Sequence, residues 1–223
     1  MWRKIHVGME ELQSVVYEHL KDMIVNHQLE YDTIYSERKV ASQLGISRTP
    51  MRDAIQRLVQ EKYIEIVPNK GFRLHQMNQT DIIETYQIRS ALEGYCTYQI
   101  AKNISGEQEQ KLLISLQASL SRQKIILDTS RSIEEFVELD NQFHLLIVNT
   151  LGNTSFNISF SRLLHHIRRL AILSLKHEGR MDETYQEHMN IYEAIKKGSV
   201  ELAYETTLAH MERPKWLNLD DLH

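Results

Sequence analysis

The chain has 223 residues, of which 42% are hydrophobic and 25% are charged, as in an ordinary globular protein. Its formal net charge of −4 excludes a chain that is basic throughout, and the lack of any run of about 18 apolar residues predicts no membrane span. The first residues lack the apolar stretch of a signal peptide, and the single cysteine, Cys96, excludes an intrachain disulfide, so we expect a cytoplasmic protein.

The first part of the chain predicts three helices. The segment Met9–His27 carries apolar residues at helical spacing, namely Leu12, Val16, Leu20, Met23 and Ile24. A second helix is expected to begin after Ser36 and end at Gly45, and a third is expected to begin after Ser47. Both serines are predicted caps, because serine side chains accept hydrogen bonds from the first N–H groups of a helix. The two short helices and the glycine turn predict a helix–turn–helix.

Two short β-prone runs follow the third helix. Residues 63–67 and 72–75 flank Pro68–Gly71, which predicts a hairpin with a basic tip. A helix–turn–helix followed by such a hairpin is a winged helix–turn–helix, and we assign residues 1–76 to a DNA-binding domain of that type.

The remainder of the chain predicts helices only. After a linker at 76–78, six are expected near residues 79–102, 106–124, 132–151, 154–176, 181–197 and 199–213. They define a second domain over residues 79–213, an all-α bundle of six to seven helices, and the fold class is mainly α. Residues 214–223 carry Trp216 among acidic residues and form a tail that either docks on a partner or stays mobile.

Charge is distributed unevenly between the two predicted domains. Residues 36–75 hold eight Lys/Arg against four Asp/Glu, a net charge of +4. Residues 78–223 hold 15 Lys/Arg against 20 Asp/Glu, a net charge of −5. A basic face on an acidic body can bind phosphate while the body limits non-specific adhesion.

The opening of the third helix carries side chains suited to reading DNA. A recognition helix contacts base edges through its first turns, and arginine can bridge O6 and N7 of guanine, worth roughly 1–3 kcal/mol of discrimination. An arginine in the preceding helix can reach the DNA backbone, and the hairpin tip can reach the minor groove or its phosphates. The predicted contacts are Arg38, Ser47, Arg48, Thr49, Arg52, Asn69, Lys70 and Gly71. The alternative is a solvated basic face.

This segment resembles the GntR family of bacterial transcription factors. The resemblance is carried by Ser36-Glu37-Arg38, by the run from Leu44 to Ala54, and by Lys70-Gly71-Phe72. It implies that Arg38, Arg48, Thr49, Arg52 and the wing tip contact an operator. The family often has Pro-Gly before the second helix, where this chain has Glu30-Tyr31-Asp32.

Polar residues interrupt the apolar stripes of three predicted helices. Asp140 and His144 lie one turn apart on the core stripe of residues 132–151, and His188 and His210 interrupt later stripes. A carboxylate facing a core is costly unless it is paired or bound to metal. Three imidazoles and one carboxylate suit a divalent ion, Zn²⁺, Ni²⁺ or Mn²⁺, with zinc favoured. Alternatively, each histidine is a hydrogen-bonded core residue, and Asp140 pairs with His144 within its helix.

The second domain resembles the FCD effector domain, which accompanies many GntR regulators. The resemblance is carried by the run Asp140–His144, by Leu151-Gly152-Asn153, by Glu187-His188 and by His210. It implies that the metal ligands are Asp140, His144, His188 and His210. It also implies that Arg89 faces the cavity and binds a carboxylate effector, although Arg89 could equally form an ordinary salt bridge with Glu93, four residues on.

The sequence thus predicts a ligand-responsive transcription regulator that is not an enzyme. We expect a homodimer that binds a double-stranded, pseudo-palindromic operator and responds to a small organic acid. The resemblance to the GntR family also implies a repressor rather than an activator. One alternative is a metal-dependent hydrolase with a regulatory DNA-binding head and Glu187 as base, although neighbouring helical residues point about 100° apart, which turns Glu187 away from the ion. The other alternative is a metal-free helical sensor.

Overall fold

The computed structural model of the chain describes residues 9–25 and 28–222. The expectations about the first eight residues and about a first helix reaching His27 lie outside the described residues. Between Met77 and Asn78 the chain divides into two compact units, each with its own core. Among the described residues, none of the helices is both long enough and apolar enough to cross a membrane.

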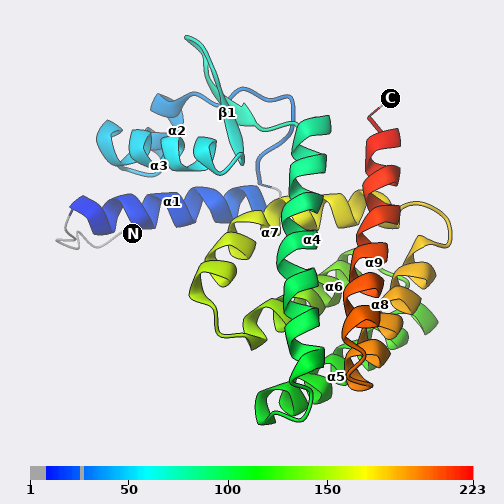
Figure 1. Cartoon of the computed structure of the whole chain (residues 1–223). Helices are drawn as coiled ribbons and strands as arrows, with labels where there is room; N and C mark the ends of the chain where they lie inside the picture. The colour runs from blue at the N-terminus through cyan, green and yellow to red at the C-terminus, as the bar shows by residue number, and fades with distance from the viewer. Residues whose placement is uncertain (1–8, 26–27, 223) are drawn as a thin grey trace. The chain divides into compact units, whose positions relative to one another are not determined.

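The N-terminal unit is a winged helix–turn–helix (Figure 1). It contains α1 (Met9–Val25), α2 (Glu37–Gln43), α3 (Arg48–Gln60), β1 (Ile64–Val67) and β2 (Gly71–Leu74). The strands pair antiparallel, with Ile64 opposite Leu74 and Val67 opposite Gly71. The predicted order of elements and the basic hairpin tip are confirmed.

Apolar side chains at helical spacing build the core of this unit. The buried face of α1, which includes Val16 and Leu20, packs with Ala54 and Leu58 of α3 and with Phe72 of the wing. The segment before α2 closes the wing from one side. There Tyr35 exchanges two backbone hydrogen bonds with Phe72, with N···O distances of 2.7 and 3.0 Å, and the two rings stack with centroids 5.8 Å apart.

The two predicted serine caps are right in position but wrong in mechanism. Ser36 and Ser47 have extended backbones immediately before α2 and α3, as capping residues do, yet neither side chain accepts a capping hydrogen bond. Both helix starts lie at the surface of the unit, where water can satisfy the first N–H groups. Gly45 takes the left-handed conformation (φ +65°) that ends α2 and turns the chain toward α3.

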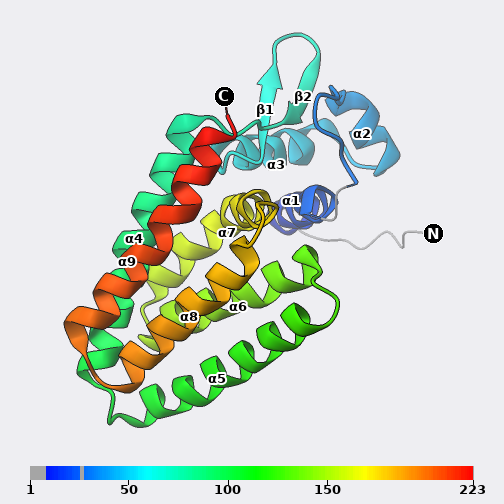
Figure 2. The same cartoon turned by 90° about the vertical axis from the view of Figure 1, so that its right-hand side faces the viewer.

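The C-terminal unit is an all-helical bundle, as predicted. Its helices are α4 (Gln79–Lys102), α5 (Glu107–Asp128), α6 (Ile133–Thr150), α7 (Thr154–Leu175), α8 (Arg180–Lys196) and α9 (Val200–Asp220). The helices α4 and α9 run side by side along their length, and α6 contacts α4, α5 and α7 (Figure 2). Phe143, Ile147, Ile191 and Ile195 are fully buried, so α6 and α8 contribute much of this core.

The expected break at Pro214 does not occur, because α9 continues to Asp220. A proline inside a helix removes one backbone hydrogen bond and typically costs about 3 kcal/mol or more. Contacts beyond the proline offset that cost. The Asn218 side chain is buried and donates from Nδ2 to the carbonyl of Pro214 (2.8 Å), to the hydroxyl of Tyr86 (3.1 Å) and to the carbonyl of Leu170 (3.2 Å). The predicted tail is therefore the last part of a helix held against α4 and α7.

Candidate functional site

The start of α3 presents its polar side chains to solvent. Its buried face is formed by Pro50, Met51, Ala54, Ile55 and Leu58, and this face fixes the rotation of the helix in its unit. The opposite face is left with Arg48, Thr49 and Arg52, all exposed, and the exposed Ser47 precedes them. The residues predicted to read base edges are thus available to a duplex.

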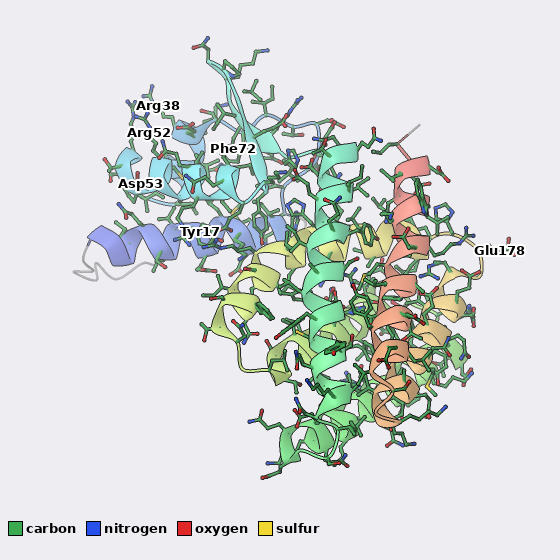
Figure 3. The ribbon with its side chains drawn as sticks, viewed as in Figure 1. Tyr17, Arg38, Arg52, Asp53, Phe72 and Glu178 are labelled. Carbon is green, nitrogen blue, oxygen red and sulfur yellow. The ribbon has the colours of Figure 1, made fainter. Side chains whose placement is uncertain are left out.

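Three arginines gather around one hollow on this face. Arg38 of α2 and Arg48 and Arg52 of α3 line a surface hollow of about 430 Å³, together with Glu37, Ala41 and Met51. Arg38 and Arg52 project outward from the same side of their unit (Figure 3). In the described part of the chain, no carboxylate forms an ion pair with any of the three guanidinium groups. Their charges are available to an external anion such as phosphate.

The wing tip also reaches solvent. Asn69 and Lys70 are exposed between the two strands, and Asn69 adopts φ +62°. Gly71, at φ +138°, has a backbone conformation that L-residues rarely adopt, and a Cβ there would lie 2.0 Å from the carbonyl oxygen of Tyr35. Gly71 therefore shapes the wing, while Asn69 and Lys70 supply its polar side chains.

The four predicted metal ligands come together inside the bundle. Asp140 and His144 lie on α6, His188 lies on α8 and His210 lies on α9, all are buried, and one ligand atom of each lies within 4.8 Å of all the others. The Oδ1 atom of Asp140 is 3.4 Å from Nε2 of His188 and 3.8 Å from Nε2 of His144. The Nε2 atoms of His144 and His210 are 3.2 Å apart.

Each imidazole is held on its far side by an oxygen atom. The Nδ1 atom of His144 lies 2.5 Å from Oε2 of Glu93, that of His188 lies 2.9 Å from Oε1 of Gln123, and that of His210 lies 2.7 Å from Oε2 of Glu187. A carboxylate or amide oxygen can only accept, so each Nδ1 carries the proton. In its neutral form, each imidazole therefore turns the lone pair of Nε2 toward the centre of the cluster.

This donor set fits a divalent cation. The Nε2 atoms of His144 and His210 face each other over 3.2 Å, and Nε2 of His188 is buried without a hydrogen-bond partner among the described residues. A buried nitrogen without a partner costs free energy, and a cation held between the three nitrogens would offset that cost. Three imidazole nitrogens and one carboxylate oxygen are ligands that zinc, nickel and manganese accept.

Burial and neighbouring charges set the protonation of the groups around the centre. Burial lowers the pKa of His188 well below its ordinary value, and the neighbouring His210 and His144 lower it further. Burial by itself raises the pKa of Glu93, but the neighbouring His144 and Arg89 outweigh that effect and lower the pKa to about 2. Neutral His188 is the form that can bind a metal ion, and ionised Glu93 is the form that accepts a hydrogen bond from Nδ1 of His144.

Arg89 lies on α4 beside this cluster and is buried. Its Nε atom donates to Oε1 of Glu93 over 2.9 Å, so the ordinary salt bridge considered from the sequence is present. Its Nη2 atom is buried and has no hydrogen-bond partner in the part of the chain that the structure describes. One edge of the guanidinium is thus engaged, and a donor on another edge is left for an acceptor that the described residues do not supply.

The sequence does not reveal the oxygen partners of the histidines. Glu93 and Gln123 lie on α4 and α5, far along the chain from the histidines that they contact. Glu187 was expected to face away from an ion, and its carboxylate indeed lies on the Nδ1 side of His210, outside the ligand set. A buried polar residue on an apolar helix face is the one signal that can find Glu93 and Gln123.

A wing beside an exposed cationic helix, together with a helical domain that encloses a polar cluster, defines a DNA-binding regulator of the winged helix–turn–helix class. Residues 12–74 match the bacterial regulatory proteins of the gntR family, and residues 84–213 match the FCD domain. The chain belongs to the GntR family of transcription regulators with an FCD domain.

Individual relatives agree with this assignment. The HTH-type transcriptional regulator YdhC of Bacillus subtilis is 28% identical over 198 residues, which span 87% of this chain and 85% of YdhC. The HTH-type transcriptional repressor RspR of Escherichia coli is 23% identical over 91% of this chain and 87% of its own length. A solved GntR regulator from Rhodococcus sp. RHA1 shares the fold, with a TM-score of 0.72 at 16% identity over 95% of this chain and 98% of that one.

The family assignment carries several general properties. The chain is a DNA-binding transcriptional regulator, and its relatives are regulators that include repressors. GntR regulators typically form dimers. FCD domains can bind metal, and the buried Asp140, His144, His188 and His210 are compatible with that property.

Proposed function

We propose that this chain is a repressor that binds a pseudo-palindromic operator as a homodimer and releases it when a small carboxylate binds a metal ion in the C-terminal domain. The DNA-binding domain is assigned to residues 1–76 and the effector domain to residues 79–213. The observation that carries the proposal is the convergence of three Nε2 atoms and one carboxylate oxygen within a regulator's helical domain.

Operator binding is assigned to the exposed cationic face of the N-terminal unit. Arg48 and Arg52 contact base edges, since they lie in the first turns of the recognition helix. The other contacts, chiefly to phosphates and the minor groove, are made by Arg38, Ser47, Thr49, Asn69, Lys70 and Gly71. Two such heads need half-sites about one helical turn apart, which supports the dimer. One relative, RspR, is a transcriptional repressor, which supports repression rather than activation by this chain.

The effector site is assigned to the metal and Arg89. Asp140, His144, His188 and His210 would hold Zn²⁺, Ni²⁺ or Mn²⁺, with zinc favoured, and a bound ion would supply a Lewis-acidic site for an oxygen ligand. The Glu93 carboxylate is balanced by Arg89, and Asp140 offsets only one of the two charges of the ion. The centre then attracts an anion, and the open Nη2 donor of Arg89 supports a carboxylate.

The two alternatives have less support. For a hydrolase, Glu187 would have to take a proton from water, but both of its carboxylate oxygens are engaged by Arg180, and one of them also by His210. No catalytic residue is therefore assigned. A metal-free sensor leaves Nε2 of His188 buried without a hydrogen-bond partner among the described residues.

Operator binding is tested with Arg48→Ala and Arg52→Ala on a duplex selected by the wild-type protein from a random pool. Each variant should lose about 1–3 kcal/mol of binding free energy, the double variant should not bind, and all should remain folded dimers. Arg122→Ala is the matched control, because it removes an exposed arginine from the C-terminal unit. Unchanged affinity of the double variant would remove the assignment of the recognition helix.

Metal binding is tested by elemental analysis of protein purified without chelators. The wild type should carry about one divalent ion per chain, and Asp140→Ala and His188→Ala should carry far less. The control is Asp182→Ala, because Asp182 is an exposed acid of α8 that pairs with Arg131. Equal metal content in the wild type and both ligand variants would rule out the proposed ligands.

A further inference from the structure

A buried arginine stands behind one of the candidate metal ligands. Arg180, the first residue of α8, is 1% exposed. Its Nη1 and Nη2 atoms donate to Oε1 and Oε2 of Glu187, both over 2.6 Å. The two residues lie seven positions apart, which places them on one face of α8 two turns apart. A bidentate pair of this kind fixes the plane and the position of the carboxylate.

The same carboxylate reaches the neighbouring helix. Oε2 of Glu187 accepts from Nδ1 of His210 on α9 over 2.7 Å. The contacts therefore run in series from Arg180 to Glu187 to His210, and they end at the Nε2 atom that faces the ligand cluster. Glu187 is anchored on one side by a cation and on the other by the imidazole that it orients.

A second series repeats this order. Arg89 donates to Glu93, and Glu93 contacts Nδ1 of His144. Two histidines, from α6 and α9, are thus each held by a carboxylate that an arginine in turn holds. His188 differs, because its partner is the neutral Gln123.

We propose that Arg180 and Glu187 are positioning residues of the metal centre, a role that rests on the proposed metal binding. Glu187 keeps the proton of His210 on Nδ1 and aims Nε2 at the ion. Arg180 engages both oxygens of Glu187, which prevents this carboxylate from turning inward to become a fifth protein ligand. A coordination position is thereby kept open for the effector.

The chain offers a close control for this role. Glu183 lies one turn before Glu187 on α8 and also accepts from Nη1 of Arg180, over 3.3 Å. Its side chain is 52% exposed, whereas that of Glu187 is 24% exposed, and Glu183 makes no contact with His210 among the described residues. Loss of either glutamate removes an acid that pairs with Arg180, but only loss of Glu187 removes the partner of the imidazole.

The test compares Glu187→Ala, Glu187→Gln and Glu183→Gln in the full chain. Zinc affinity is measured by competition with a chromogenic chelator, and the tautomer of His210 is read from ¹⁵N chemical shifts of metal-free protein. Glu187→Ala should bind zinc roughly 10- to 100-fold more weakly and lose the fixed Nδ1–H tautomer. Glu187→Gln keeps an acceptor for Nδ1, so it should keep the tautomer and lose less affinity. Glu183→Gln should match the wild type in both measurements.

The outcomes separate the two proposals. Wild-type zinc affinity in Glu187→Ala, or an equal loss in Glu187→Ala and Glu183→Gln, would overturn the positioning role. If Glu187→Ala does not fold, the near-isosteric Glu187→Gln decides through its affinity relative to Glu183→Gln. If the wild type binds no zinc, the proposed metal function fails. The tautomer in metal-free protein then still shows whether Glu187 positions His210.

Discussion

Replacing Gly71 with alanine is the sharpest test of the wing geometry. Gly71 begins β2 at φ +138°, and its missing Cβ would lie 2.0 Å from the carbonyl oxygen of Tyr35. That oxygen accepts a hydrogen bond from the N–H of Phe72, and the N–H of Tyr35 donates to the carbonyl of Phe72. An alanine side chain thus forces the two segments apart at the point where they pair.

The cost has two parts. Holding an L-residue in this backbone region costs about 1–3 kcal/mol. Separating Tyr35 from Phe72 loses two hydrogen bonds, each worth about 1 kcal/mol net. A gain of about 0.4–1 kcal/mol from the less flexible unfolded chain offsets part of the cost. We expect Gly71→Ala to destabilise the wing by about 2–5 kcal/mol.

Amide hydrogen exchange of residues 64–74 measures this change, with α5 as internal standard. A loss of 2 kcal/mol of local stability accelerates exchange about 30-fold. Gly45→Ala is the control, since Gly45 also has a positive φ, +65°, but a Cβ there meets no atom within 4 Å. That variant should cost only about 1 kcal/mol, within its own turn. If Gly71→Ala and Gly45→Ala give the same exchange rates for residues 64–74, the close approach of Gly71 to Tyr35 does not determine the stability of the wing.

Three further outcomes are expected. Asn218→Ala removes a buried donor to three acceptors and should lower the free energy of unfolding by about 2–3 kcal/mol. The control, Asn190→Ala, replaces an exposed residue and should change the free energy of unfolding little. Equal effects of the two variants would contradict the role assigned to the end of α9. The pKa values of His188 and His210 are lowered in the fold, so their contribution to stability is complete above pH 6.5 and is lost as the pH falls below it. Urea unfolding in chelator should therefore give a lower stability at pH 5.5 than at pH 7.5, by up to roughly 1.4 kcal/mol per pH unit for each imidazole, and a flat profile would refute this. Burial raises the pKa of Cys96 to about 12, so a thiol reagent at pH 8 should label the unfolded chain and spare the native one; rapid native labelling would show that the thiol is accessible.

The N-terminal unit follows from local sequence signals. The turn glycine at 45, the cationic start of α3 and the two β-prone runs around Asn69 and Lys70 each act within a few residues. Their structural outcome was therefore open to prediction, including the exposure of Arg48 and Arg52. Whether Ser36 and Ser47 would form capping hydrogen bonds could not be predicted from the sequence, because their side chains compete with water for the first N–H groups of the helix.

In the C-terminal unit, several features depend on tertiary packing and could not be predicted from local sequence. Asp140 and His144 stand out because they interrupt an apolar face of one helix, and the structure places them beside His188 and His210. The partners of these histidines are set by how distant helices pack, and no local spacing links Gln123 to His188. The continuation of α9 through Pro214 likewise depends on tertiary contacts made by Asn218.

The ligand cluster joins positions that are remote in the chain. Asp140 and His210 bracket a loop of roughly 70 residues, and a covalent cross-link across such a loop removes about 4 kcal/mol of conformational entropy from an unfolded chain. With a single cysteine, the chain has no internal disulfide to do this. A coordinated ion would serve as a reversible staple across α6, α8 and α9, so metal scarcity would loosen this bundle much as a reductant loosens a disulfide-bonded domain.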